Sequence, residues 1–89
     1  MKVFERNRDA DPRDEKSRRP LTWARFPWPT GGVVVEATCA NGHTGTLSSR
    51  IHSVDVLGNV SPSYVCPYAG CGFHEIVRLA DWEPIGDMR

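Results

Sequence analysis

The chain has 89 residues, of which 39% are hydrophobic and 25% are charged, and its formal net charge at pH 7 is +0. A chain of this length supports one small domain whose hydrophobic core is only marginally sufficient. No apolar run approaches the roughly 20 residues that a membrane-spanning helix needs. Charged residues follow the first four residues directly, so we expect no signal peptide.

The first 22 residues differ in composition from the rest of the chain. They carry many residues of both charges and almost no apolar side chain after Phe4. Segments of mixed charge without a hydrophobic stripe remain solvated. We therefore expect residues 1–22 to form a flexible, charged N-terminal arm.

Residues 23–32 contain three large aromatic side chains and two prolines. The prolines hold the segment extended and exclude it from helices and from the hydrogen bonding of a central strand. One interpretation is that the segment folds back as a strap over the open face of the domain. The other is that it inserts into a partner's groove, because Trp and Arg are typical of binding hot spots. The partner-binding candidates are Trp23, Arg25, Phe26 and Trp28.

Residues 33–82 have the pattern of short β strands. The β-branched run at residues 33–38 predicts one strand, and we expect others at residues 45–49, 51–57 and 60–65, with Gly58 and Asn59 as a two-residue hairpin turn. Residues 73–82 fit either a closing strand or a helix face, and the adjacent Ile76 and Val77 favour the strand. Residues 83–89 are expected to form a tail.

Two short pairs of metal-ligating residue types lie within this β region. The first pair has the spacing Cys-x3-His and the second Cys-x4-Cys. Three cysteines leave one thiol unpaired in a disulfide scaffold but suit a Cys3His metal site. Zinc binds thiolates and imidazole in a closed tetrahedron that leaves no position for water. We therefore predict one structural Zn²⁺, with the ligands Cys39, His43, Cys66 and Cys71.

The fourth ligand has two alternatives to His43. His74 lies shortly after the second pair, and His52 lies between the pairs. We favour His43 and expect the other two histidines on the solvent face of strands. Buried free thiols or a disulfide between Cys66 and Cys71 would account for the cysteines without a metal, but neither explains the position of His43.

The run Cys-x-x-Gly-His at residues 39–43, followed by Cys-Pro-x-x-x-Cys-Gly at residues 66–72, resembles the zinc ribbons. These small metal-stabilised β modules occur in transcription, translation and phage proteins, and the resemblance covers about residues 33–82. Ribbon pairs usually read Cys-x-x-Cys, so the spacing here assigns no functional subfamily. The resemblance implies a small β fold with an antiparallel sheet and an extended N-terminal arm. A helix over residues 73–82 would instead give a treble clef.

Metal binding is expected to dominate the stability of such a module. A core this small supplies on the order of 3–5 kcal/mol, whereas zinc binding supplies about 10–16 kcal/mol in zinc-finger peptides. We therefore expect the metal-free chain to be largely unfolded.

No arrangement of residues in the sequence favours catalysis. The serines lack a nucleophile elbow, no glycine-rich phosphate loop is present, and the carboxylates are dispersed. We predict a protein that is not an enzyme and has no small-molecule substrate. The thiols and the zinc favour the cytoplasm, or a virion if the protein is of phage origin.

Two functional interpretations remain. In the favoured one, the protein is an interaction or assembly module whose arm and aromatic segment contact a larger protein assembly, as in phage structural or accessory proteins. In the alternative, it is a nucleic-acid-binding or transcription-associated ribbon. Few cationic residues follow Arg25, which disfavours this alternative. Its candidate phosphate contacts are Arg18, Arg19, Arg25 and Arg50, and its candidate stacking residues are Trp23 and Trp28.

Overall fold

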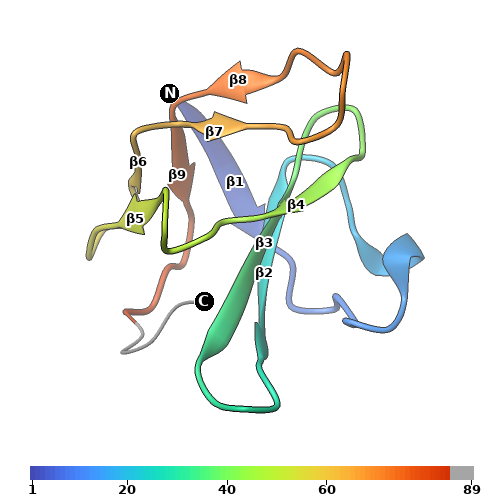
Figure 1. Cartoon of the computed structure of the whole chain (residues 1–89), viewed down its shortest axis with the longest axis vertical. Coiled ribbons are helices and arrows are strands. Elements are labelled where there is room, and N and C mark those ends of the chain that lie inside the picture. Colours follow the sequence, from blue (N-terminus) through green and yellow to red (C-terminus); the bar gives the residue numbers. More distant parts are fainter. Residues whose placement is uncertain (85–89) are drawn as a thin grey trace.

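This computed structural model describes residues 1–84, which contain nine short β strands, one 3-10 turn and the loops that connect them (Figure 1). The fold is therefore small and all-β, as predicted. The strands are β1 (Lys2–Arg6), β2 (Thr22–Pro27), β3 (Val33–Thr38), β4 (Thr44–Thr46), β5 (Ser53–Val54), β6 (Val60–Ser61), β7 (Tyr64–Val65), β8 (His74–Glu75) and β9 (Val77–Leu79), and the turn is η1 (Glu15–Ser17).

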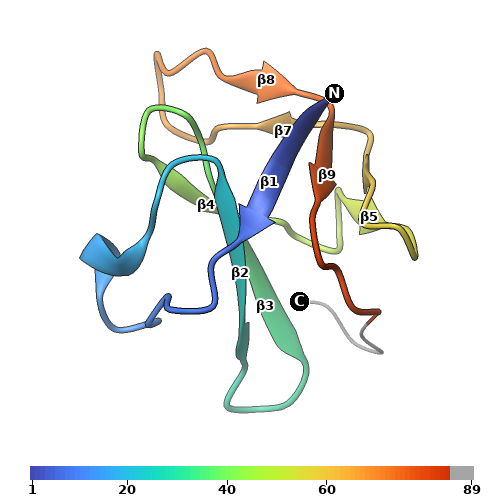
Figure 2. The same ribbon diagram turned by 180° about the vertical axis from the view of Figure 1, so that it is seen from behind.

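A five-stranded sheet with the order β4-β3-β2-β1-β9 forms the body of the protein. Strand β3 runs antiparallel to β2 and to β4, whereas β1 runs parallel to both of its neighbours. Seen from behind, β1 lies between β2 and β9 (Figure 2). The sheet is thus mixed, which corrects the expectation of a purely antiparallel ribbon.

Two small hairpins complete the fold. Strands β5 and β6 form one antiparallel pair, and β7 and β8 form the other. The backbone of Leu79 in β9 donates a hydrogen bond to the carbonyl of Gly58 at 2.8 Å, which attaches the β5–β6 hairpin to the sheet. The loop between β7 and β8 contains the second pair of candidate metal ligands.

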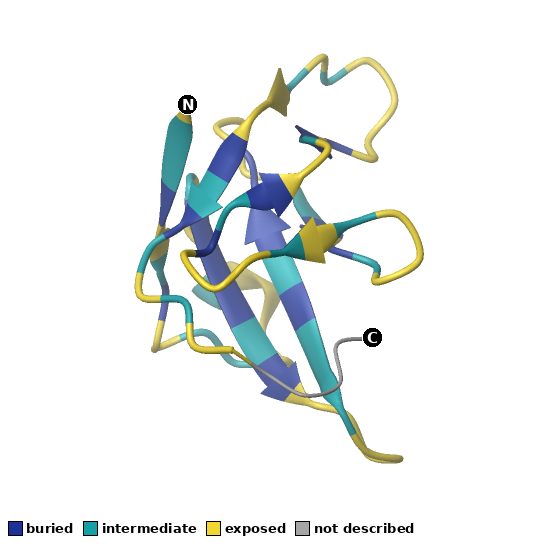
Figure 3. Ribbon diagram, turned by 90° about the vertical axis from the view of Figure 1, so that its left-hand side faces the viewer, coloured by how far each residue is buried: buried dark blue, intermediate teal, exposed yellow. Residues whose placement is uncertain are grey.

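The core lies between the five-stranded sheet and the hairpins. The buried segments follow the long strands, while the connecting loops are largely exposed (Figure 3). The ring of Phe4 lies 6.2 Å from that of Tyr64 and 6.1 Å from that of Phe73, within the range of favourable aromatic pairs. The largest fully buried side chains are Trp23, Tyr64, Phe4, Leu47, Leu79, Val35, Val77 and Cys39.

The N-terminal segment is not a flexible arm, so that prediction is wrong. Strand β1 pairs with strands on both sides, and the Phe4 side chain is 0% exposed. The following loop is held by the buried Asn7, whose Nδ2 donates to the carbonyl of Ser17 at 2.8 Å. Strand pairing, the buried Phe4 and side-chain hydrogen bonds such as that from Arg18 to Glu36 therefore fix this segment on the sheet.

The aromatic segment is also placed differently from the prediction. Strand β2 occupies the centre of the sheet, which is possible because Pro27 is its last residue. Trp23 and Phe26 are buried within the protein, with exposures of 1% and 8%. They therefore belong to the core and are out of reach of a partner, whereas Trp28 is half exposed at 48%.

The β pattern of residues 33–82 is confirmed in outline. Strand β3 has the predicted bounds, and residues 73–82 contain strands and no helix, so the treble-clef alternative is wrong. The strands expected at residues 45–49 and 51–57 are shorter, and the one at residues 60–65 is divided into β6 and β7 around Pro62. Of the expected tail, residues 85–89 lie outside the described residues.

The predicted two-residue turn at Gly58 and Asn59 is wrong. Five residues, 55–59, connect β5 to β6. Within this loop the Asp55 carboxylate accepts hydrogen bonds from the backbone amides of Leu57 and Asn59, both at 2.9 Å. These bonds stabilise a longer loop. No helix within residues 1–84 is long and apolar enough to cross a membrane.

Candidate metal centre

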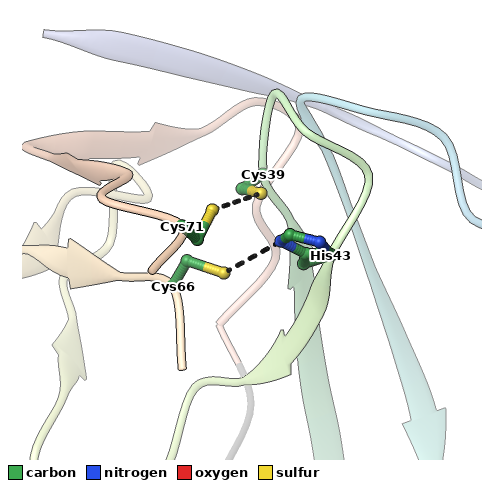
Figure 4. A group of neighbouring side chains, drawn as sticks. All are labelled: Cys39, His43, Cys66 and Cys71. Carbon is green, nitrogen blue, oxygen red and sulfur yellow. Dashed lines mark hydrogen bonds between the residues drawn. The ribbon is translucent and has the colours of Figure 1, made fainter. Parts of the chain in front are cut away.

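The four predicted metal ligands come together between two loops. Cys39 and His43 belong to the loop that joins β3 to β4, and Cys66 and Cys71 belong to the loop that joins β7 to β8. Their side chains point toward one another from the two loops (Figure 4). The four candidate ligand atoms all lie within 4.8 Å of one another.

Two of the distances within the cluster are close to those of a tetrahedral metal site. The sulfurs of Cys39 and Cys71 are 3.7 Å apart, and the sulfur of Cys66 is 3.7 Å from Nδ1 of His43. Bond lengths to zinc of about 2.3 Å for sulfur and about 2.0 Å for nitrogen, at tetrahedral angles, give separations of roughly 3.8 Å between two sulfurs and roughly 3.5 Å between sulfur and nitrogen. All three cysteines are free, so the disulfide alternative is wrong.

The first loop is shaped by its own backbone. The amide of Cys39 donates to the carbonyl of His43 at 2.9 Å, and the amide of Gly42 donates to the carbonyl of Cys39 at 3.0 Å. Gly42 has φ +84, in the left-handed region that glycine adopts without strain. The loop therefore turns tightly enough to direct Cys39 and His43 to the same side.

The second loop is closed in a similar way. The amide of Cys66 donates to the carbonyl of Phe73 at 2.9 Å, and the amide of Cys71 donates to the carbonyl of Tyr68 at 3.1 Å. Gly72 follows with φ +73, again in the left-handed region that glycine adopts without strain. Both cysteine side chains are thus directed by backbone hydrogen bonds toward the first loop.

Two residues that the sequence did not indicate support the ligands. The backbone amide of Asn41 donates to the sulfur of Cys39, and its side-chain Nδ2 donates to the sulfur of Cys71, both at 3.3 Å. The ring of Tyr68 stacks on the imidazole of His43, with centroids 4.3 Å apart and planes within 5°. Both residues lie between ligands in the sequence, which is the only signal that pointed to them.

The environment of the cysteines favours a bound cation. The hydrogen bond from Asn41, followed by those from the Phe73 amide and from His43, lowers the pKa of Cys71 to about 6. Burial is the main cause that raises the pKa of Cys66. The Cys71 thiol therefore ionises more readily than a free thiol, while the Cys66 thiol ionises less readily. A bound metal ion would stabilise the thiolate form of both.

The other two histidines are not part of the cluster. His74 is exposed on β8, and its Nε2 shares a hydrogen bond with Oγ of Ser63 at 2.8 Å, as expected for a polar residue on a strand. His52 is half-buried beside Tyr64 and precedes β5, so its expected place on the solvent face of a strand is wrong. Neither alternative for the fourth ligand is supported.

No protein-family model, curated protein or solved structure matches this chain. The zinc-ribbon resemblance therefore rests on the residues of the two loops alone. The structure establishes a small all-β protein with a Cys3His cluster that is close enough to hold a metal ion.

Proposed function

We propose that the protein is a non-enzymatic zinc module in which one Zn²⁺ links the β3–β4 loop to the β7–β8 loop. The observation that carries this proposal is the mutual distance of at most 4.8 Å among the four candidate ligand atoms. The residues that would hold the ion are Cys39, His43, Cys66 and Cys71.

The donor set favours zinc over other common ions. Three sulfurs and one imidazole nitrogen suit zinc, whereas magnesium and calcium prefer oxygen ligands. Four protein ligands fill a tetrahedral shell and leave no position for a substrate or a reactive water. When bound, the ion would neutralise thiolate charge and cross-link the two loops, so its role is structural.

The small size of the β7–β8 hairpin explains why such a cross-link is useful. Each of its strands has two residues, and an isolated pair of short strands is unstable in water. Tyr64 and Phe73 attach the hairpin to the core through their ring contacts with Phe4. A metal held by Cys66 and Cys71 would fix the opposite end of the same hairpin.

Native mass spectrometry of two histidine variants tests this proposal. We expect one zinc per chain in the wild type and in His74→Ala, because His74 lies outside the cluster. His43→Ala removes a ligand and is expected to lose most of the zinc under the same conditions. Retention of zinc by His43→Ala together with its loss from His74→Ala would contradict the ligand assignment.

We further propose that the module binds a protein partner through the tip of the β5–β6 hairpin. Val56 and Leu57 are adjacent at this tip and are 74% and 69% exposed. The Asp55 carboxylate holds the loop backbone through bonds to the amides of Leu57 and Asn59 before any partner binds. A preorganised loop backbone reduces the conformational entropy that is lost on binding. The proposed contact thus moves from the buried Trp23 and Phe26 to this tip.

The double variant Val56→Ser/Leu57→Ser tests the partner surface. Native mass spectrometry of the tagged protein, expressed in its own source, would compare the mass of the attached partner with that in a matched control, Val65→Ser. Val65 is also exposed, at 55%, but lies on β7. We expect the double variant to lose the partner and the control to retain it, and the reverse result would contradict the proposal. An origin in a phage remains a prediction of the resemblance.

A further inference from the structure

Three arginines line one cavity at the end of β1. The cavity has a volume of about 200 Å³, and its six lining residues include no acidic side chain. A single water molecule occupies about 30 Å³ of liquid volume, so the space is large enough for a small hydrated anion. The lining residues are Arg6, Asn7, Arg8, Ala10, Arg25 and Phe26.

One carboxylate already binds to this group of arginines. Oε1 of Glu83 lies 3.1 Å from a guanidinium nitrogen of Arg6, and its Oε2 lies 3.0 Å from one of Arg25. The hydrogen bond from Arg6 is the first cause that lowers the pKa of Glu83, followed by the charge of Arg25, and the charge of Arg8 acts in the same direction. All three arginines therefore stabilise negative charge at one place.

The Arg6 side chain and the turn that carries Arg8 are held in position before any ligand arrives. The guanidinium of Arg6 lies over the ring of Trp23, 5.0 Å from its centroid, and its side chain is 12% exposed. Asn7 is buried between Arg6 and Arg8, and its side chain bonds to the carbonyl of Ser17 and to the amide of Asp9. The turn that carries Arg6 and Arg8 is thus fixed by the fold.

A carboxylate does not satisfy all three cations. Glu83 has two carboxylate oxygens, and both are bound, one by Arg6 and one by Arg25. Arg8 makes no hydrogen bond or ion pair with any of residues 1–84. A phosphate group offers at least one more charged or polar oxygen, and guanidinium groups bind phosphate oxygens through paired N–H donors.

We propose that this cavity is a binding site for a phosphate group, in which Arg6, Arg8 and Arg25 contact the phosphate oxygens. The Glu83 carboxylate acts as an internal competitor, because it occupies donors of Arg6 and Arg25 that the phosphate would use. This proposal goes beyond the zinc module and does not depend on it. The phosphate belongs either to a small soluble phosphate compound or to the backbone of a single-stranded nucleic acid.

The site differs from the phosphate contacts expected from the sequence. Arg18 is only 9% exposed and lies 2.8 Å from the Glu36 carboxylate, so it is engaged within the protein. Its guanidinium also lies over the ring of Phe26, at 4.9 Å. Of the predicted cations, only Arg25 belongs to the cavity.

Calorimetric titration of the full-length protein with inorganic pyrophosphate, and anisotropy titration with a labelled oligothymidylate of about twelve nucleotides, test the site. We expect at least one of the two probes to bind at low salt. The pyrophosphate titration detects a small phosphate compound as the source, and the oligothymidylate titration detects a nucleic-acid backbone. Binding of either probe through the site supports the proposal.

Two charge variants with matched controls show whether the cavity is the binding site. Arg8→Gln is expected to weaken binding about fivefold, whereas Arg50→Gln removes a positive charge elsewhere and is expected to leave it unchanged. Glu83→Gln is expected to strengthen binding about threefold or more, and Glu75→Gln, on β8, is expected to have no such effect. Absence of binding of both probes to the wild type and to Glu83→Gln would overturn the proposal. Equal losses in Arg8→Gln and Arg50→Gln would overturn it as well.

Discussion

Truncation of Phe4 tests whether the charged N-terminal segment is part of the folded core. The side chain is 0% exposed, and it contacts the rings of Tyr64 and Phe73 at centroid distances of 6.2 and 6.1 Å. Loss of a buried Phe side chain costs about 3–5 kcal/mol, and the cost is greatest where the surroundings cannot collapse. Strand β1 is paired on both sides, so little collapse is possible. We expect Phe4→Ala to lower the free energy of unfolding by about 4 kcal/mol.

Urea unfolding of the zinc-loaded protein, followed by far-UV circular dichroism, measures this change. With a dependence on urea of about 1–2 kcal/mol/M, the midpoint is expected to fall by roughly 2–4 M. Ile51→Ala is a suitable control, because Ile51 is 69% exposed, and such surface changes alter stability by about 0.5 kcal/mol or less. If Phe4→Ala leaves no folded baseline, Phe4→Leu retains part of the contact and is expected to cost about 1–2 kcal/mol.

The result that would refute the reasoning is a change in Phe4→Ala as small as that in Ile51→Ala. Such a result would mean that residues 2–6 are not packed in solution. The segment would then be the flexible arm that its composition predicts.

Three further predictions concern a glycine, a ligand support and a surface ion pair. Gly58 and Gly31 both have positive φ, at +91 and +104, so substitution by Ala at either is expected to cost roughly 1–2 kcal/mol of backbone strain in urea unfolding. A Cβ at Gly58 would also collide with the carbonyl oxygen of Leu79, whereas a Cβ at Gly31 meets no atom within 4 Å, so Gly58→Ala is expected to cost more than Gly31→Ala. Equal costs would contradict the close approach. Because Tyr68 stacks on the His43 ring, Tyr68→Ala is expected to weaken zinc affinity about tenfold, as measured by competition titration with a chelator. An unchanged affinity would show that the stacking does not orient the imidazole. The pKa of Glu83 is lowered from its ordinary value of 4.5 by Arg6 and Arg25. The ion pairs of Glu83 therefore stabilise the folded protein fully above pH 4.5, and this stabilisation is lost as the pH falls through the lower pKa of the folded state. Glu83→Gln is expected to reduce the loss of stability between about pH 5 and pH 3 in thermal melts, and the same loss in the variant as in the wild type would contradict this ion pair.

Local patterns predicted the parts of the fold that depend on neighbouring residues. Strand β3 has its predicted bounds because four of its six residues are β-branched and the run is bounded by Gly32 and Cys39. The ligand pairs were predictable because each pair lies within one tight loop, where spacing along the chain determines spacing in the fold. The two pairs were predicted to meet in one cluster because three thiolates and one imidazole complete a single tetrahedral zinc shell, and the structure brings them together.

The parts that were mispredicted depend on contacts between distant residues. Strand β1 pairs with β9, at the other end of the described chain, and a single Phe in a charged segment gives no periodic signal of that pairing. The role of Pro27 could not be read from its presence alone, because a proline is excluded from the interior of a central strand but not from its end. The Asp55 loop was missed because its side-chain hydrogen bonds compete with the two-residue turn that Gly58 and Asn59 favour.

The same limit applies to the surfaces proposed for binding. Arg6, Arg8 and Arg25 lie on two strands and a turn, and only the parallel pairing of β1 with β2 brings them to one cavity. Trp23 and Phe26 have the residue types of a binding hot spot, yet the sheet buries them. Composition therefore predicted the chemistry available to this chain, while the nonlocal pairing of β1 determined which of those residues remain accessible.

X-ray absorption spectroscopy at the zinc edge, on the protein purified without added metal, tests the central claim most directly. We predict one zinc per chain with a first shell of three sulfurs at about 2.3 Å and one nitrogen at about 2.0 Å. A shell with fewer sulfurs, a shell of oxygen ligands, or protein that folds without any bound metal would contradict a closed structural site built from Cys39, His43, Cys66 and Cys71.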